Sequence, residues 1–194
     1  MRLPPDFFVR PALQVARDLL GQTLVLREGG TRRSGRIVET EAYVGEHDLA
    51  CHASKGRTPR TEVLFGPPGK AYVYLVYGMH HCFNVVTCPE GVAAAVLVRG
   101  LEPLEGVAAG LRTDGPGKLC RALGITLRHN RLDLRGRTLF LEPGPAVPAR
   151  SVMRGPRVGV DYSGSWARKP YRLWVKDNRF VSHAARLDVR RTES

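Results

Sequence analysis

The segment from Lys70 to Thr87 constrains the fold more than any other part of the chain. It is rich in tyrosine and valine, and its single glycine, Gly78, lies near its centre. Aromatic and β-branched residues favour strands, and a glycine between two such runs favours a tight turn. We therefore predict a β-hairpin whose two antiparallel strands meet at a Tyr77-Gly78-Met79 tip.

Further strands are predicted by short runs of apolar and β-branched residues at positions 23–26, 36–44, 93–98, 138–142, 157–160 and 171–175. Helical spacing predicts helices over residues 11–20, 103–111 and 118–123. Residues 45–70 and the Pro/Gly-rich residues 143–156 predict loops, and the first is long enough to suggest a function. The expected fold class is α+β: a single mixed domain over residues 1–194 with a curved, largely antiparallel β-sheet, flanking helices and a protruding β-hairpin.

The strand predicted over residues 36–44 carries two carboxylates. Its period of two divides the side chains between two faces, with Ile37, Glu39, Glu41 and Tyr43 on one and Val38, Thr40, Ala42 and Val44 on the other. Two interpretations of the acidic face remain open. It is either an exposed strand surface, or a pocket wall in which carboxylates alternate with an aromatic ring.

The composition points to a polyanionic partner. The 194 residues include 30 Lys and Arg against 18 Asp and Glu, which gives a formal net charge of +12 and a pI near 10.2. Most of the basic residues are arginines, whose planar guanidinium suits phosphate contacts. Arginine richness can also follow genome composition, and a basic surface that serves only solubility is the alternative.

The four cysteines, at positions 51, 82, 88 and 120, form no C-x-x-C pair. The N-terminal residues lack the pattern of a signal peptide, and no stretch has the length of a membrane span. We therefore expect reduced cysteines, a cytoplasmic location and no contact with a membrane.

Several nucleotide and metal motifs are incomplete. Gly117-Lys118 is followed by Leu119, and Arg112 occupies the place of the first glycine of a phosphate-binding loop. The H-x-E and P-C-x-x-C elements of zinc deaminases are absent. The ligand types in His80-His81-Cys82 and Cys51-His52 would suit a metal, but their spacing matches no standard zinc pattern, so we expect neither a metal nor another cofactor.

A set of motifs nevertheless extends in order along most of the chain: Arg36–Tyr43 (RIVETEAY), His52, Arg57–Arg60 (RTPR), Tyr72–Met79 (YVYLVYGM), Asn84, Val98–Gly106 (VRGLEPLEG), Gly117–Cys120 (GKLC) and Trp166–Pro170 (WARKP). Together they resemble the alkyladenine (3-methyladenine) DNA glycosylase family, and among its members the bacterial ones. Several long motifs with preserved spacing are more specific than any one of them.

The resemblance implies a DNA repair enzyme that flips an alkylated or deaminated purine out of double-stranded DNA and hydrolyses its N-glycosidic bond. Glu41 matches the general base that activates the attacking water. Arg99 matches an arginine that helps to hold that water and the nearby phosphate. Because the active-site strand motif contains no lysine for a Schiff base, we expect a monofunctional enzyme that leaves an abasic site.

The resemblance also assigns the residues that hold the flipped nucleotide. Tyr77 matches the side chain that intercalates into the DNA, where it recovers stacking. Tyr43 and Tyr74 would sandwich the purine with help from His52, and cationic alkylated purines would gain a cation–π contribution there. Asn84 matches a residue that disfavours normal guanine by crowding its exocyclic amino group.

Four basic residues, Arg57, Arg60, Lys118 and Lys169, are expected to contact the DNA backbone, although an ordinary solvated surface also explains the two lysines. His80 and His81 depart from the pattern, because aromatic residues follow the hairpin tip in the mammalian members. A monomer is the simplest expectation.

Two other functions stay open: a noncatalytic nucleic-acid-binding domain of the same fold, and a hydrolase of free nucleosides. The sequence does not rank 3-methyladenine, 7-methylguanine, hypoxanthine and ethenoadenine as substrates.

Overall fold

The structure is a computed structural model that describes residues 1–182 of the chain. Its strands are β1 (Thr23–Glu28), β2 (Thr31–Tyr43), β3 (Ala71–Val76), β4 (His80–Thr87), β5 (Ala94–Glu105), β6 (Leu139–Glu142), β7 (Val152–Gly155) and β8 (Arg172–Val175). Its α-helices are α1 (Ala12–Leu19) and α2 (Pro116–Leu123). Its 3-10 helices are η1 (Pro5–Phe7), η2 (His52–Lys55), η3 (Glu62–Phe65), η4 (Leu127–His129), η5 (Ala149–Ser151) and η6 (Asp161–Arg168).

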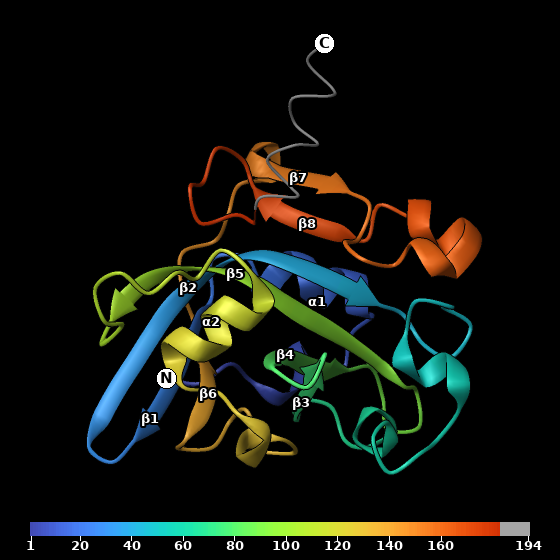
Figure 1. Cartoon of the computed structure of the whole chain (residues 1–194), viewed down its shortest axis with the longest axis horizontal. Coiled ribbons are helices and arrows are strands. Elements are labelled where there is room, and N and C mark those ends of the chain that lie inside the picture. Colours follow the sequence, from blue (N-terminus) through green and yellow to red (C-terminus); the bar gives the residue numbers. More distant parts are fainter. Residues whose placement is uncertain (183–194) are drawn as a thin grey trace.

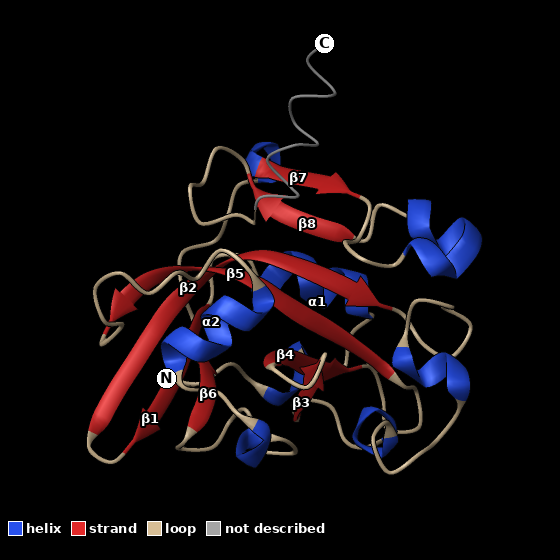
Figure 2. Ribbon diagram, in the orientation of Figure 1, coloured by secondary structure: helices blue, strands red, loops and turns tan. Residues whose placement is uncertain are grey.

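All the strands of this range belong to one curved antiparallel sheet, as Figures 1 and 2 show. The strand order is β3-β4-β5-β2-β1-β6, and β8 joins β2 and carries β7. One edge of β2 pairs with β5, while its other edge pairs first with β1 and then with β8. The predicted fold class is confirmed. The single domain predicted over residues 1–194 extends beyond the described residues.

The main core lies between the sheet and the two α-helices. Along α1 the buried residues Ala12, Val15, Ala16 and Leu19 follow the i, i+3, i+4, i+7 spacing of one helical face. The Thr40 hydroxyl of β2 donates to the Ala16 carbonyl oxygen at 2.9 Å and fixes α1 on the sheet. Helix α2 buries Leu119, Cys120 and Leu123 in the same core.

The strands β3, β4 and β5 have two different faces. Residues of the main core alternate with residues of the opposite face, because successive side chains in a strand point to opposite sides. The core face holds Ala71, Val73, Phe83, Val85, Val96 and Val98, and the opposite face holds Tyr72, Tyr74, Cys82, Asn84, Leu97 and Arg99. This opposite face forms the floor of the pocket described below.

The predicted division of β2 into two faces is wrong at its start. Ile37 packs in the main core with Ala42, whereas Val38 packs in a separate cluster with Trp174. The register of β2 against β5 shifts on both sides of Glu39, which is a β-bulge. A bulge inserts one residue into the alternation and reverses it locally, so Ile37 does not share the face of Glu39 and Glu41.

Two predicted elements are also wrong. The predicted helix 103–111 is absent, because β5 continues to Glu105 and pairs with β2 over that length. The predicted strand 157–160 is absent as well, and strand β7 lies within the predicted loop 143–156. β7 forms because β8 offers it a free edge, and this pairing depends on a segment that comes later in the chain. None of the helices described is long and apolar enough to cross a membrane.

Candidate active site

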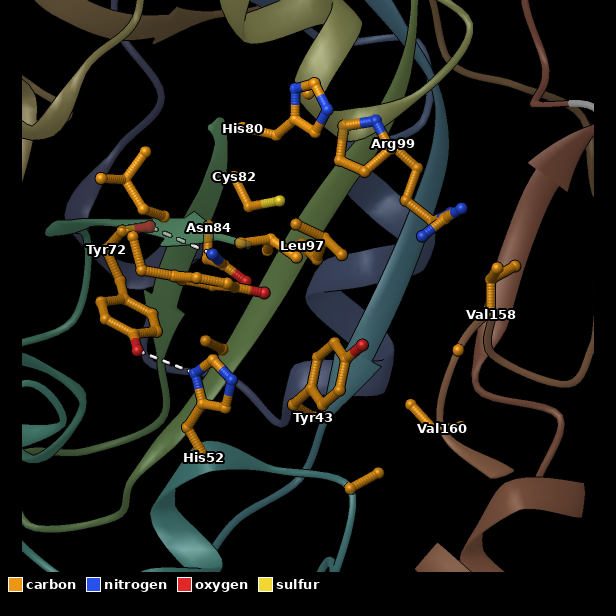
Figure 3. A pocket seen from close by; sticks show the side chains of 18 of the residues that line it. Tyr43, His52, Tyr72, His80, Cys82, Asn84, Leu97, Arg99, Val158 and Val160 are labelled. Atoms are coloured by element: carbon orange, nitrogen blue, oxygen red, sulfur yellow. Dashed lines mark hydrogen bonds between the residues drawn. The ribbon is translucent and has the colours of Figure 1, made fainter. Parts of the chain in front are cut away.

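A pocket of about 680 Å³ opens on the face of β3, β4 and β5 that points away from the main core. Figure 3 shows its floor and two of its walls. The lining residues include Tyr43, His52, Arg60, Tyr72, Tyr74, Tyr77, Cys82, Asn84, Leu97, Arg99, Lys118, Val158 and Tyr162. They come from four strands, from the turn between β3 and β4, from the loop after β2, from the start of α2, and from η6 and the segment before it.

The loop after β2 is held against the sheet by a second, smaller apolar core. Cys51, Val63, Leu64 and Phe65 pack there against Tyr72 and other strand residues. This packing explains why a segment without sequence periodicity is ordered, and it carries His52 and Arg60 to the pocket. The prediction of a long ordered loop is correct, apart from its two 3-10 helices, η2 and η3.

His52 is fixed at the wall of the pocket by two tyrosines. Its Nδ1 forms a 2.8 Å hydrogen bond with the Tyr72 hydroxyl, and its ring meets that of Tyr74 edge to face, with centroids 4.6 Å apart. Burial, with smaller contributions from Arg60 and Lys55, lowers the pKa of His52 to about 4. The imidazole is therefore neutral at pH 7, and its Nε2 is the nitrogen available to a ligand.

Tyr43 lies across the pocket from Tyr72 and Asn84 (Figure 3). Its hydroxyl donates to Glu41 Oε2 at 2.9 Å, and the guanidinium of Arg157 lies 4.7 Å from its ring centroid. Burial, reinforced by the negative charge of Glu41, raises the pKa of Tyr43 well above its usual value. The phenol therefore stays protonated as a hydrogen-bond donor, and its ring presents a flat surface to the pocket.

Glu41 lies directly behind this wall. Its side chain is fully buried and does not itself line the pocket. The Val158 amide donates to Glu41 Oε1 at 2.7 Å, and Arg99 Nη1 lies 3.4 Å from the same oxygen. The exposed-strand interpretation of Glu41 is thus wrong. The carboxylate accepts hydrogen bonds from the Tyr43 hydroxyl and the Val158 amide and forms an ion pair with Arg99.

Arg99 connects Glu41 to the second carboxylate, Glu39. Arg99 Nε donates to Glu39 Oε1 at 3.3 Å, and Arg99 also reaches the pocket surface. Glu39 accepts further hydrogen bonds from the backbone amide of Ser182 at 2.7 Å and from the Ser182 hydroxyl at 2.8 Å. The guanidinium is thereby held between two buried carboxylates, with little freedom to change its orientation.

A fully buried ion pair joins the two loops on either side of the pocket. Arg157 donates to both oxygens of Asp48, at 2.5 and 2.8 Å, and to the Ala42 carbonyl oxygen at 2.9 Å. Asp48 also accepts from the backbone amides of Val44 and Ala50. Because Val158 follows Arg157 directly, this ion pair also fixes the amide that donates to Glu41.

Asn84 is held by the strand next to it. Its Nδ2 donates to the Tyr72 carbonyl oxygen at 3.1 Å, and the residue is 3% exposed. This bond turns the side-chain carbonyl oxygen away from Tyr72. Asn84 therefore presents a fixed hydrogen-bond acceptor on the pocket floor.

The tip of the β3–β4 hairpin presents Tyr77 to solvent. Tyr77 and Gly78 both have positive φ angles, of 51° and 68°, and the Met79 amide donates to the Val76 carbonyl oxygen at 3.1 Å. Positive φ at both central residues is the requirement of a type I′ hairpin turn. This turn leaves Tyr77 88% exposed at the edge of the pocket, and Met79 beside it 72% exposed.

The four predicted backbone contacts lie in different places. Arg60 and Lys118 line the pocket, the latter with its Nζ 3.4 Å from Asp114 Oδ1. Arg57 and Lys169 do not line it. They are exposed and lie over aromatic rings, Arg57 over Phe65 at 4.7 Å and Lys169 over Trp166 at 5.7 Å.

Several lining or supporting residues were not predicted. Tyr72, Cys82 and Leu97 belong to the same strand faces as Tyr74, Asn84 and Arg99, so a period of two along β3, β4 and β5 would have identified them. The Asp48–Arg157 ion pair joins residues 109 positions apart and left no local signal. Across residues 1–182, no group of three or more His, Cys, Asp and Glu side chains is placed to hold a metal ion.

The arrangement suits hydrolysis of a bond carried by a planar ring. Aromatic side chains and a neutral imidazole surround a space large enough for a nucleobase. A carboxylate and an arginine lie behind one wall, where they can orient a water and stabilise positive charge. An exposed tyrosine stands at the entrance.

A family model and several curated proteins are similar to this chain over nearly its whole length. The family model described as Methylpurine-DNA glycosylase (MPG) matches residues 6–179. A Myxococcus xanthus (strain DK1622) protein named "Putative 3-methyladenine DNA glycosylase" is 67% identical over 180 residues, covering 93% of each chain. Proteins of the same name from Anaeromyxobacter dehalogenans (strain 2CP-C) and Methanocella arvoryzae are 53% and 50% identical. The alignments cover 95% and 96% of this chain and 88% and 98% of those proteins.

Proposed function

Because the chain belongs to the methylpurine-DNA glycosylase family, we propose that it flips alkylated or deaminated purines out of double-stranded DNA and hydrolyses their N-glycosidic bonds. The observation that carries this proposal is the buried Glu41 behind an aromatic pocket of nucleobase size. The sugar carbon of a stacked nucleotide is inaccessible to such a carboxylate, so the nucleotide must first leave the helix.

Tyr77 would fill the gap that the flipped nucleotide leaves in the base stack. Its ring is already exposed on a tight turn at the pocket entrance. Stacking between a base and an aromatic side chain contributes roughly 1–3 kcal/mol, which is comparable to the few kcal/mol needed to extrude a damaged base. The wedge therefore offsets much of the cost of flipping.

The flipped purine would lie between Tyr43 on one side and Tyr74 with His52 on the other. His52 Nε2 and the Asn84 carbonyl oxygen are the polar groups that would meet the edges of the base. Asn84 would disfavour normal guanine by crowding its exocyclic amino group. The lesions that this pocket would receive are 3-methyladenine, 7-methylguanine, hypoxanthine and ethenoadenine.

Glu41 would act as the general base. The bond between N9 of the purine and C1′ of the sugar breaks with its electron pair on N9, and the oxygen of a water bonds to C1′. One proton of that water passes to Glu41, and the other stays on the new hydroxyl. The carboxylate and Arg99 would orient the water, and Glu41 would also stabilise positive charge on the sugar. A positioned base typically contributes a rate factor of about 10²–10⁴.

The reaction would leave an abasic site and an uncut strand. A lyase needs a neutral amine that attacks C1′. Lys118 lines the pocket, but its Nζ is held in an ion pair 3.4 Å from Asp114 Oδ1. We therefore propose a monofunctional enzyme without a cofactor, acting as a monomer on cytoplasmic DNA, with Arg57, Arg60, Lys118 and Lys169 on the phosphates.

The decisive experiment is single-turnover base release from duplexes that carry one hypoxanthine or one 7-methylguanine, at saturating protein. We expect release by the wild-type protein and a loss of about 10²–10⁴-fold in Glu41→Gln, with DNA binding retained. Glu39→Gln is the matched control, because Glu39 is equally buried and also contacts Arg99. Similar losses in both variants would argue against Glu41 as the base.

The alternative is a noncatalytic domain of the same fold that binds DNA. It predicts tight binding of lesion-containing duplexes by the wild-type protein without base release. Activity on free nucleosides that is insensitive to salt would instead indicate a nucleoside hydrolase, because a DNA substrate makes binding strongly salt-dependent.

A further inference from the structure

The pocket surface carries positive charge and no negative charge. Among its lining residues in the part of the chain described, the Arg and Lys residues are Arg60, Arg99 and Lys118, and none is Asp or Glu. Arg99 and Lys118 both form ion pairs with carboxylates. Within residues 1–182 no such pair involves Arg60, so its charge is the one that a ligand in the pocket meets without a neutralising partner.

Arg60 is close to the surface on which a base would stack. Its guanidinium carbon lies 5.1 Å from the ring centroid of Tyr74, and this ring meets that of His52 edge to face. Aromatic rings in contact have centroids about 4.5–7 Å apart, so a purine on Tyr74 would lie within roughly 12 Å of the guanidinium. The screening length at physiological salt is about 8 Å and the Arg60 side chain is exposed, so salt weakens this repulsion without abolishing it.

We infer that Arg60 is a specificity-determining residue that makes the pocket respond to the charge of the bound purine, an inference that rests on the proposed function. A purine alkylated at N3 or N7 of its nucleotide carries a positive charge, and Arg60 repels it. Hypoxanthine and ethenoadenine are neutral, so Arg60 does not oppose their capture. The cation–π attraction that the tyrosines offer to cationic purines is thereby reduced.

The same charge acts differently when the glycosidic bond breaks. The electron pair of the N9–C1′ bond stays on the purine, so a neutral purine becomes anionic and a cationic purine becomes neutral. The oxygen of the attacking water bonds to C1′, and its proton passes to Glu41. A fixed cation stabilises both changes in charge, because each transition state is less positive at the purine than its ground state. Arg60 therefore weakens capture of cationic purines and accelerates departure of both kinds.

These two effects are separable by enzyme titration in single-turnover experiments. Duplexes of one sequence would carry hypoxanthine, ethenoadenine or 7-methylguanine, and each titration gives a half-saturating protein concentration and a maximal rate. Arg60→Gln is expected to lower the half-saturating concentration for 7-methylguanine, relative to the two neutral lesions, by roughly 2- to 5-fold, as for other exposed charge interactions. Its maximal rate is expected to fall several-fold for all three lesions.

The readout is the ratio of half-saturating concentrations for 7-methylguanine and a neutral lesion. A lost phosphate contact weakens binding of every duplex equally, so it cancels in this ratio. Arg57→Gln, on the same loop but outside the pocket lining, is the matched control and should leave the ratio unchanged. Arg60→Lys keeps the charge and should behave like the wild type. An unchanged ratio in Arg60→Gln would overturn the inference, and so would a lysine variant that behaves like the glutamine variant. In either case, base release by the wild type would still support the proposed function. Absence of wild-type release from every duplex would refute both.

Discussion

His52 shows how burial and neighbouring charge set the state of a single side chain. Its ring contacts two tyrosines, and two cations, Arg60 and Lys55, add to the effect of burial. Both influences disfavour the imidazolium, and they lower the pKa to about 4. Tyr43 shows the opposite direction, because burial beside a carboxylate raises the pKa of a phenol. The pocket thus holds a neutral imidazole and a neutral phenol at the same pH.

The lowered pKa of His52 predicts a loss of stability in acid. In the unfolded chain a histidine binds a proton near pH 6.5, but the folded protein resists protonation until about pH 4. The contribution of His52 is therefore complete above pH 6.5 and is lost as the pH falls from about 6.5 to about 4. At about 1.4 kcal/mol for each pH unit, the loss is at most roughly 3–4 kcal/mol.

Urea unfolding of the wild type and of His52→Gln, measured from pH 7.5 to pH 4, checks this expectation. The difference in unfolding free energy between the two proteins should be constant above pH 7 and should shift against the wild type in acid. A difference that stays constant over the whole range would contradict the lowered pKa.

At the scale of elements, the sequence predicted strands and turns that depend on neighbouring residues. It did not predict features that depend on pairing with distant strands. The hairpin of β3 and β4 forms at the predicted tip, because the turn residues lie next to the strands that they join. The bulge at Glu39 and the edge strand β7 depend on partners distant in the chain, so periodicity alone could not place them. The residues of the candidate site divide in the same way between local and long-range determinants. Its strand residues share visible periods, whereas Asp48 and Arg157 meet only in the folded chain.

The buried Asp48–Arg157 pair is expected to contribute strongly to the attachment of the two loops. Both side chains are fully buried, and Asp48→Ala would leave the guanidinium without its carboxylate. Removing one partner of such a pair costs about 3–5 kcal/mol. The variant should lose that amount of unfolding free energy, and the resulting displacement of Val158 should also reduce the maximal rate of base release.

Glu62→Ala is the control, because the Glu62–Arg131 pair is about half exposed on both sides. Exposed pairs contribute roughly 0–1 kcal/mol, so this variant should remain close to the wild type in urea unfolding. Equal destabilisation by the two substitutions would show that burial does not distinguish these ion pairs.

At the scale of the whole molecule, the motifs predicted more than the composition did. The net charge of +12 indicated only a polyanionic partner. The ordered motifs predicted the family, and the match over residues 6–179 confirms it. The curved sheet explains why motifs so far apart in sequence act together, since β2, β3, β4 and β5 bring them to one pocket. The roles of the individual residues stay predictions.

The basic charge predicts a steep dependence of DNA binding on salt. Each phosphate contact contributes about −0.9 to the slope of log K against log salt concentration. Lys118→Gln should therefore make the slope less negative by about 0.9 when binding to an undamaged duplex is titrated from 50 to 200 mM salt. Arg135→Gln is the control, because Arg135 pairs with Asp133 and does not line the pocket. An unchanged slope in Lys118→Gln would remove Lys118 from the DNA contacts.

The surroundings of Glu41 determine where a proton can bind. Its Oε1 faces the Val158 amide and the Arg99 guanidinium, whereas among residues 1–182 Oε2 accepts a hydrogen bond from the Tyr43 hydroxyl alone. A carboxylate oxygen has about two lone pairs, so the open one is on Oε2. A proton abstracted from water would bond there, beside the Tyr43 hydroxyl. The two oxygens of Glu41 would thus differ in role. Oε1 would hold the side chain in place through Val158 and Arg99, and Oε2 would accept the proton.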